Sequence, residues 1–163
     1  MSSNKKIVNA TRNTYDDIVF KSILEKTVYS TLILLGYNPQ YEPQTFTLFE
    51  GFNPITPFYD KMSDSKMKKA KLGCRMLELK SGKIIGIKYT PDFYFRYKDI
   101  DVYIEAKGME NDVFYIKKKL FIKFLDDRYA STGQKSMYFE IYNKRQLLQA
   151  LEIIKDYGKD SSR

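Results

Sequence analysis

Apolar residues in the first third of the chain recur at helical spacing before the pattern changes to strand-like alternation. The apolar positions from Ile18 to Leu35 follow the helical period, which predicts a helix over this range. Gly36 comes directly after it, where a glycine can end a helix as a C-cap. Residues 41–50 then read as a strand, and residues 51–57, which contain glycine and proline, predict a loop.

The middle of the chain is predicted to be mostly β. Residues 74–80 and 84–88 flank Ser81–Gly82, a dipeptide that suits a tight turn, so this region predicts a β-hairpin. Two more strand-like runs follow, at Tyr89–Phe95 and at Asp101–Gly108, with a short charged turn between them. We therefore expect the sheet to continue through both runs.

The last third of the chain reads as helix, strand and helix. Asn111 or Asp112 can cap a helix that runs to about Arg128, residues 136–142 form a strand, and Asn143 can cap a terminal helix. The order of the elements predicts an α/β fold in which a small central mixed sheet is flanked by helices.

The length of the chain predicts a single domain. A chain of 163 residues can bury a core without disulfides or metals to staple it. We expect a flexible tail over residues 1–13 and one domain over residues 14–158, which carries a basic insertion at about residues 51–84. Residues 159–163 are expected to form a frayed C-terminus.

Composition narrows the chemistry that this domain can perform. The chain has no histidine and a single cysteine, Cys74, which excludes an intrachain disulfide, a multi-cysteine zinc site and histidine-based catalysis. Any metal must therefore bind to oxygen ligands. The N-terminus lacks an apolar signal core, and no stretch approaches the roughly 20 apolar residues of a membrane span. We expect a soluble, cytoplasmic protein without a membrane partner.

Positive charge is concentrated in one segment. The net charge is +8, and residues 61–83 contain eight basic residues against Asp64 and Glu78. A basic balance suits a polyanionic partner, although it also describes many solvated surfaces. The segment is either a solubilising arm or a phosphate-binding one, and its position beside the strand runs favours phosphate binding.

Two carboxylates and a lysine are predicted to converge in the strand runs. Asp92 lies in Tyr-Thr-Pro-Asp-Phe, and Glu105 follows thirteen positions later in Glu-Ala-Lys-Gly. Strand alternation points Glu105 and Lys107 to the same side of a sheet. Carboxylates gather Mg²⁺ or Mn²⁺, and an ammonium can counter the charge of a phosphodiester transition state. Each residue alone could be an ordinary turn or exposed strand residue, but the combination favours a metal-dependent nuclease.

These motifs, in this order of elements, resemble the PD-(D/E)xK nuclease superfamily, and within it the phage endonuclease I family of Holliday-junction resolvases. The segments that match are Ser22-Ile23-Leu24-Glu25, Tyr89–Phe93 and Glu105-Ala106-Lys107-Gly108. The resemblance covers roughly residues 20–50 and 85–123 and departs from the family over residues 51–84 and in the C-terminal third. A related group of small phage proteins with the same signatures fits about equally well.

The resemblance implies a restriction-endonuclease-like core and a site of four side chains: Glu25, Asp92, Glu105 and Lys107. Asp92 and Glu105 are the expected metal ligands, together with the backbone carbonyl of Ala106. Glu25 would complete a second metal position, so we expect two Mg²⁺ or Mn²⁺ ions. A homodimer that cuts branched DNA is implied, in a bacterial cytoplasm if the protein is encoded by a phage.

Several lysines are candidates for contacts with DNA phosphates. We expect such contacts from the basic segment and from the helix after the second strand run, where lysines could equally form a solvated face. The candidates are Lys66, Lys68, Lys69, Lys71, Lys117 and Lys118.

Three alternatives to a junction-cutting enzyme remain open at this point. The protein could be a general or flap-cutting nuclease of the same superfamily. It could be a nucleic-acid-binding protein without catalysis, although the loss of a ligand or of the lysine that would indicate this is not seen. It could also be an interaction protein that reuses the fold, which would bind a partner but no metal.

Overall fold

The computed structural model describes residues 13–69, 77–108 and 112–160. This part of the chain has a mixed α/β fold with four helices and several small sheets. Its helices are α1 (Ile23–Leu34), α2 (Asp64–Lys69), α3 (Asp112–Thr132) and α4 (Lys144–Asp160). Its strands are β1 (Asn13–Tyr15), β2 (Ile18–Phe20), β3 (Gln40–Tyr41), β4 (Phe46–Phe49), β5 (Phe58–Lys61), β6 (Leu77–Lys80), β7 (Ile87–Tyr89), β8 (Phe93–Tyr97), β9 (Ile100–Ala106) and β10 (Lys135–Ile141).

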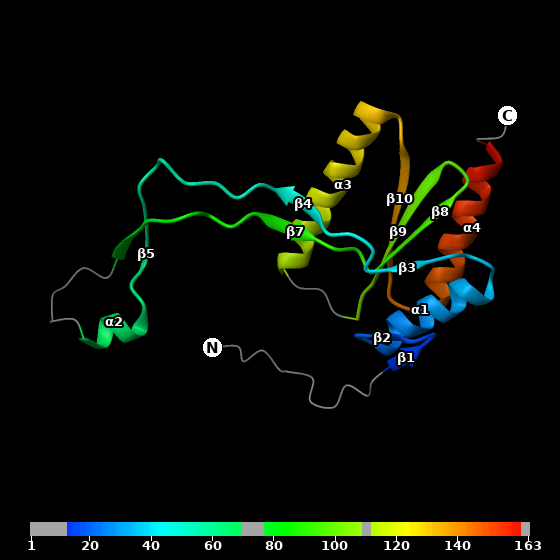
Figure 1. Cartoon of the computed structure of the whole chain (residues 1–163), viewed down its shortest axis with the longest axis horizontal. Helices are drawn as coiled ribbons and strands as arrows, with labels where there is room; N and C mark the ends of the chain where they lie inside the picture. Colours follow the sequence, from blue (N-terminus) through cyan, green and yellow to red (C-terminus); the bar gives the residue numbers. More distant parts are fainter. Residues whose placement is uncertain (1–12, 70–76, 109–111, 161–163) are drawn as a thin grey trace.

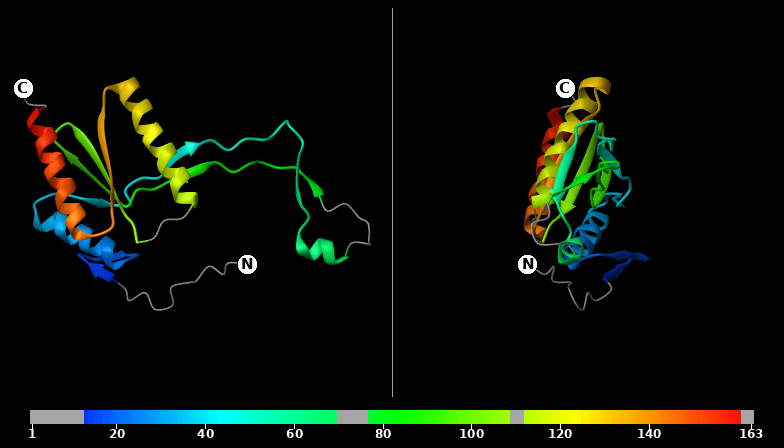
Figure 2. Two further views of the ribbon diagram at one scale, coloured as in Figure 1. Left: turned by 180° about the vertical axis from the view of Figure 1, so that it is seen from behind. Right: turned by 90° about the vertical axis from the view of Figure 1, so that its left-hand side faces the viewer.

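A four-stranded mixed sheet in the order β10-β9-β8-β3 forms the centre of the fold. β9 pairs in parallel with β10 and antiparallel with β8, and β3 pairs antiparallel with β8. Figures 1 and 2 show α1 and α4 on one side of this sheet and α3 on the other. The predicted α/β class is confirmed.

β9 lies between two layers of helices, and all seven of its residues are buried. Ile100 and Val102 belong to the core beneath α1 and α4, whereas Tyr103 belongs to the cluster beneath α3. Because side chains alternate along a strand, Asp101 and Glu105 lie on the α3 face together with Tyr103. Two acidic side chains are therefore buried on one face of the central strand.

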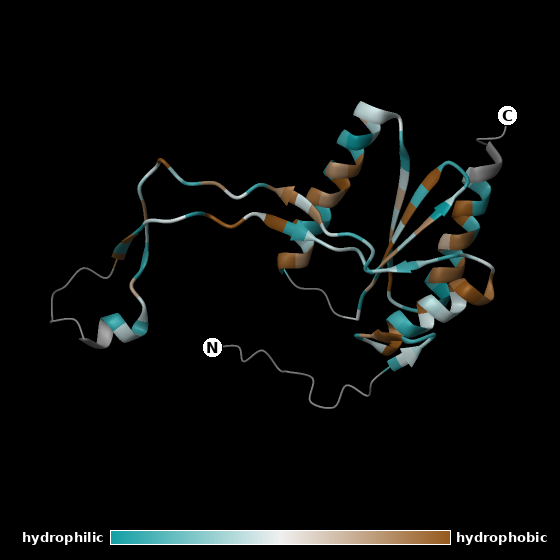
Figure 3. Cartoon of the chain, in the orientation of Figure 1, coloured by the Kyte–Doolittle hydropathy of each residue, from teal (hydrophilic) through white to brown (hydrophobic). Residues whose placement is uncertain are grey.

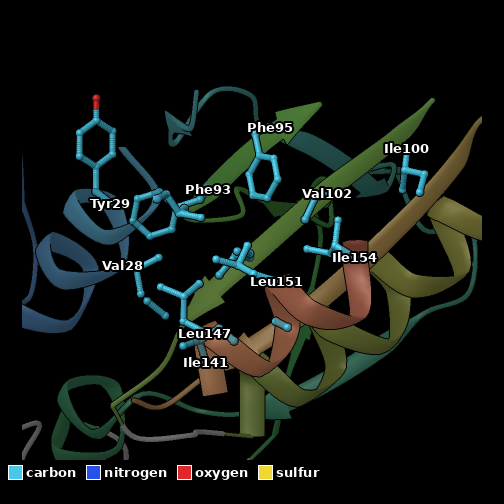
Figure 4. Packing of buried hydrophobic residues seen from close by; sticks show 14 of the residues in the cluster. Val28, Tyr29, Phe93, Phe95, Ile100, Val102, Ile141, Leu147, Leu151 and Ile154 are labelled. Atoms are coloured by element: carbon cyan, nitrogen blue, oxygen red, sulfur yellow. The ribbon is translucent and has the colours of Figure 1, made fainter. Parts of the chain in front are cut away.

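The larger core joins the sheet to α1 and α4, as Figure 4 shows. Leu147 and Ile154 of α4 and Val28 of α1 are fully buried against Phe93 and Ile104 of the sheet. Each such side chain removed from water contributes roughly 1.5–3 kcal/mol. This core holds α1, which carries Glu25, against the central sheet.

Aromatic rings fill the space between the sheet and α3. The ring centroid of Phe121 lies 4.8 Å from that of Tyr89, 5.3 Å from that of Tyr103 and 5.2 Å from that of Phe46. Phe114, in the first turn of α3, belongs to the same buried cluster. The cluster fixes β7 and the start of α3 beside the end of β9.

The described residues of the segment 50–86 form an arm that extends away from the sheet and its helices (Figure 1). Its two legs are joined by a bridge between Phe52 and Ile84 and by the antiparallel pairing of β5 with β6. Apolar residues, brown in Figure 3, lie along the arm, and the side chains of Ile55 and Ile85 are 99% and 86% exposed. The arm therefore has no core of its own within the described chain.

Two glycines bring the legs of the arm together at its base. A Cβ atom at Gly51 would lie 2.7 Å from the carbonyl oxygen of Ile84, and one at Gly86 would clash with the carbonyl oxygen of Phe49. Neither position has room for a side chain, so the close crossing of the two legs requires glycine on both.

The predicted helix over residues 18–35 is wrong at its start and right at its end. α1 begins at Ile23 because the Ser22 hydroxyl accepts a hydrogen bond from the N–H of Glu25 at 3.1 Å and caps the helix. Ile18 instead lies in β2, which pairs with β1. Gly36 follows the helix with a φ of 81°, a conformation that favours glycine.

The predicted strand over residues 41–50 is divided into two. β3 ends at Tyr41, Glu42 has a φ of 45°, and Pro43 follows before β4 begins at Phe46. A left-handed residue and a proline cannot continue a regular ladder. The chain therefore leaves the central sheet at this point, and β4 pairs with β7.

The predicted β-hairpin around Ser81–Gly82 is wrong. β6 pairs with β5 and β7 pairs with β4, so residues 81–82 lie along one leg of the arm rather than at a turn between partners. The long-range pairing gives hydrogen-bond partners to backbone N–H and C=O groups on both legs of the arm. A local hairpin around residues 81–82 would leave those of the first leg unpaired. Residues 74–76 of the predicted strand lie outside the described residues.

The predicted elements of the last third are confirmed. α3 continues four residues beyond the predicted end at Arg128, to Thr132, and β10 matches the predicted strand closely. Asn143 caps α4, because its Oδ1 accepts a hydrogen bond from the N–H of Gln146 at 3.0 Å. Asn111 lies outside the described residues. None of the described helices combines the length and the apolar character that crossing a membrane requires.

A buried ion-pair network ties α3 to the start of β9. Asp101 is 5% exposed, and its Oδ2 accepts a hydrogen bond from Nη2 of Arg128 at 2.7 Å. Its Oδ1 accepts from Nη1 of Arg96 at 2.7 Å and from the hydroxyl of Tyr94 at 3.0 Å. Arg128 also donates to Ser136 of β10 at 2.7 Å.

Replacing Asp101→Ala should lower the free energy of unfolding by about 3 kcal/mol, because Arg128 would lose its buried counter-ion. Asp99→Ala is the matched control, since Asp99 pairs with Lys135 at 3.0 Å and its side chain is 50% exposed. The control should cost less than about 1 kcal/mol. Urea unfolding measures both, and equal losses would contradict the importance of the buried network.

Candidate active site

A polar cavity of about 560 Å³ opens where the base of the arm meets the end of β9 and the first turn of α3. It gathers side chains from segments far apart in the sequence. Its lining consists of Lys21, Glu42, Thr45, Lys88, Tyr89, Thr90, Asp92, Glu105, Lys107, Val113, Phe114 and Lys117. Three of the four predicted catalytic side chains therefore share one cavity.

Strand pairing places Asp92 next to the end of β9. Asp92 immediately precedes β8, and the first residue of β8, Phe93, pairs with Ile104 of β9. Oδ2 of Asp92 accepts a hydrogen bond from the N–H of Ala106 at 2.8 Å, which links the start of β8 to the end of β9. The position of Asp92 is therefore set by the main chain of the neighbouring strand.

Glu105 is held by a tyrosine that the sequence did not single out. The hydroxyl of Tyr89 donates to Oε2 of Glu105 at 2.7 Å and lies 3.1 Å from the hydroxyl of Tyr138. Nζ of Lys107 lies 3.5 Å from Oε1 of Glu105. Tyr89 belongs to the motif that carries Asp92, but only the packing of β7 against β9 shows that it contacts Glu105.

The two carboxyl groups of the cavity repel each other. Burial and the charge of Glu105 raise the pKa of Asp92 to about 8, although the hydrogen bond from Ala106 opposes the change. Burial also raises the pKa of Glu105, against the hydrogen bond from Tyr89 and the charge of Lys107. Burial in the cavity thus disfavours the charged form of both carboxyl groups.

Glu25, the fourth predicted catalytic residue, lies behind the cavity rather than in its lining. It is 6% exposed, and its Oε2 accepts hydrogen bonds from the hydroxyl of Tyr41 at 2.6 Å and from the N–H of Lys21 at 3.0 Å. Its charge nevertheless contributes to the raised pKa of Asp92. The structure brings Glu25 into the electrostatic field of the site but not into contact with the cavity.

Several lysines line the cavity. Of the two lysines of α3 that are candidates for phosphate contacts, one lies in the cavity lining and the other forms an ion pair. Lys117 lines the cavity, whereas Nζ of Lys118 donates to Oε2 of Glu140 at 2.9 Å. Lys21 and Lys88 also line the cavity, and neither was expected from the sequence. Lys21, which precedes α1 in the chain, also forms an ion pair with Glu42.

Three of the lysines predicted to bind DNA in the basic segment belong to α2, which lies on the arm. Lys66 is exposed on α2, and its Nζ lies 2.5 Å from Oε2 of Glu78. Lys68 and Lys69 also lie in α2, and Lys71 lies outside the described residues. Lys66 does not belong to the lining of the cavity.

The donors of the cavity suit a hard cation. Oδ1 of Asp92 makes no hydrogen bond with the described residues, so it can coordinate a metal ion without breaking an existing contact. Over the described residues, no group of three or more acidic or cysteine side chains is arranged to hold a metal ion. An ion would therefore draw on Asp92 and Glu105, on main-chain oxygen such as that of Ala106, and on water.

The raised pKa of Asp92 predicts a pH-dependent stability in the presence of a chelator. The folded protein keeps a proton on Asp92 up to about pH 8, whereas the unfolded chain releases it near pH 3.8. The free energy of unfolding should therefore fall as pH rises between these values. Asp92→Asn should remove much of this fall in the free energy of unfolding, and the part removed should be at least about 1 kcal/mol. Urea unfolding in chelator, at pH values near both ends of this range, measures the free energy of unfolding of the wild type and of the variant. An equal fall in both proteins would refute the assignment.

Comparison with known proteins returns no relationship. No family model, no curated protein and no solved structure matches the chain. What the site can do therefore follows from its own geometry and chemistry.

Proposed function

We propose that the chain is a Mg²⁺- or Mn²⁺-dependent DNA endonuclease with a restriction-endonuclease-like core of the PD-(D/E)xK type. The observation that carries the proposal is the convergence of Asp92, Glu105 and Lys107 in one polar cavity. These residues come from a strand start, a strand end and the position just after that end. Two buried carboxyl groups beside an ammonium suit a metal ion and a phosphodiester.

The chain's own residues divide the work of hydrolysis. Asp92 and Glu105 would hold the metal together with the carbonyl of Ala106, and Tyr89 keeps Glu105 in place. When bound, the ion lowers the pKa of a water molecule and neutralises charge on the phosphate. Lys107 orients the attacking water and counters the negative charge of the transition state.

A second ion would be bound by Glu25. Its carboxylate is buried beside the cavity, where its charge reaches Asp92. Oε2 of Glu25 already accepts a hydrogen bond from the Tyr41 hydroxyl. To coordinate the ion, Glu25 would have to give up that hydrogen bond or use its other oxygen. Two ions near one phosphate clamp both the attacking and the leaving oxygen.

The lysines of the cavity support a nucleic-acid substrate. Lys21, Lys88 and Lys117 line the cavity around the carboxylates, where they can contact phosphates on either side of the scissile one. Such contacts position a duplex without reading its sequence. We infer that the protein selects its DNA target by shape, as a Holliday-junction resolvase does.

The proposal includes a homodimer, because two symmetric cuts resolve a four-way junction. It also includes a phage origin, which the resemblance to phage endonucleases implies. The arm supports a dimer, since an isolated two-stranded ribbon is marginally stable in water. Its exposed apolar side chains, which include Ile55 and Tyr59, would be buried by a second copy. The lysines of α2 would then follow the DNA backbone.

Purified protein should cut an end-labelled four-way junction in Mg²⁺ but not in chelator. Linear duplex, flap and single-stranded DNA of matching sequence are compared in the same assay. Paired symmetric nicks confined to the junction are the expected result. Cutting of every substrate would indicate a general nuclease, and cutting of none would end the enzyme proposal.

Asp92→Ala and Lys107→Ala should each abolish cleavage while junction binding stays near that of the wild type. Binding persists because most of the affinity comes from phosphate contacts outside the metal site. Gel-shift titration and the cleavage assay are run on the same preparations. Turnover that survives in either variant would overturn the site assignment.

Neutralising Lys66, Lys68, Lys69 and Lys71 to glutamine should flatten the dependence of junction binding on salt. Each lost phosphate contact should reduce the slope of log K against log salt by about 0.9. Lys144→Gln and Lys155→Gln on α4, on the opposite face of the sheet from the cavity, form the control and should leave the slope unchanged. An unaltered slope in the fourfold variant would exclude the arm from DNA binding.

A further inference from the structure

We propose that Phe114 is a positioning residue whose ring holds the ammonium of Lys107 in the cavity. This inference rests on the proposed nuclease function, which gives Lys107 its role beside the phosphate. Nζ of Lys107 lies 3.9 Å from the centroid of the Phe114 ring. An ammonium this close to an aromatic face is attracted by the negative potential of the ring.

The main chain fixes only the start of the Lys107 side chain. The N–H of Lys107 donates to the carbonyl oxygen of Ile141 at 2.9 Å, which extends the pairing of β9 with β10. Beyond the backbone, the side chain has a flexible four-carbon stem. Its side chain is nevertheless only 20% exposed, so contacts near its end must restrict it.

Glu105 alone is a weak anchor for this ammonium. Nζ of Lys107 lies 3.5 Å from Oε1 of Glu105, which is at the long limit of a hydrogen bond. In the proposed reaction, Glu105 is also shared with a metal ion. The ring of Phe114, whose centroid lies 3.9 Å from the ammonium, supplies a second restraint that a bound metal ion would not compete for.

Phe114 is itself held rigidly. It is 5% exposed and belongs to the aromatic cluster beneath α3 that includes Tyr89 and Phe121. Lys118 also approaches its ring, at 5.9 Å, but the Lys118 ammonium contacts Glu140 at 2.9 Å and lies 4.6 Å from the ring of Tyr115. Lys107 is therefore the nearer of the two cations to the face of Phe114.

A ring serves this purpose better than a carboxylate would. A carboxylate in the place of Phe114 would hold Lys107 but cancel its charge and add to the repulsion around Asp92. The ring has no net charge, so it attracts the ammonium while the positive charge stays available to a phosphate. It also lacks strong acceptor atoms, so the N–H groups of Lys107 can serve Glu105 and the substrate.

Fluorinated phenylalanines test this role without changing the shape of the core. Replacing Phe114 with mono-, di- and trifluorinated phenylalanine weakens the negative face of the ring in steps. We expect kcat for junction cleavage to fall stepwise, by about tenfold over the series. KM and the Mg²⁺ concentration for half-maximal rate should stay unchanged.

Phe124 is the matched control, because its ring lies in the same aromatic cluster, 5.2 Å from that of Phe46. No contact joins it to Lys107 among the described residues. The same fluorinated series at Phe124 should leave kcat unchanged. A flat series at Phe114, or equal losses at both positions, would overturn the inference.

A second measurement decides the contact without relying on cleavage. In protein labelled with ¹³C-lysine, the Hε protons of Lys107 should resonate upfield, because they lie over an aromatic ring. Lys107→Met assigns the signal, and Phe114→Leu should return it to the ordinary lysine position. An ordinary shift in the wild type would refute the contact. If no DNA is cut in Mg²⁺, the proposed function fails, and this experiment still decides where Lys107 lies.

Discussion

The burial of β9 on both faces is the constraint on which the rest of the structure depends. All seven residues of this strand are buried, yet two of them, Asp101 and Glu105, are acidic. A buried carboxylate needs partners or it destabilises the fold. At one end of the strand, Arg96 and Arg128 supply them, and α3 is tied to the sheet as a result. At the other end, the compensation is incomplete, and the cavity forms there.

The two buried carboxylates of β9 differ in how fully their surroundings hold them. Asp101 accepts hydrogen bonds from two guanidinium groups and a tyrosine. Glu105 has the hydroxyl of Tyr89 and a long contact with Lys107, and it faces Asp92 across the sheet end. Burial disfavours the charged form of such carboxyl groups, and a bound cation would favour it. A site that gains from binding a cation is what the proposed metal-dependent chemistry requires.

The aromatic cluster beneath α3 connects the cavity to the rest of the fold. Tyr89 and Phe114 both belong to it, and each contacts a charged residue of the cavity. The arm, by contrast, has little packing of its own, and at its base its legs cross closely because Gly51 and Gly86 have no side chains. The molecule thus combines a rigid centre that places the charged groups with an arm whose apolar side chains remain exposed.

Local patterns were enough to predict the α/β class, the last three elements, and the convergence of Asp92, Glu105 and Lys107 in one place, because strand alternation and capping act between close neighbours in the chain. They were not enough for the start of α1 or for the pairing of β5 with β6 and of β4 with β7, where partners far apart in sequence outweigh local turn chemistry. The positions of Tyr89, Lys88 and Phe114 at the cavity likewise follow only from packing. A hydroxyl, an ammonium or a ring acquires its partner when strands and helices from distant segments meet, and that meeting is a property of the tertiary structure.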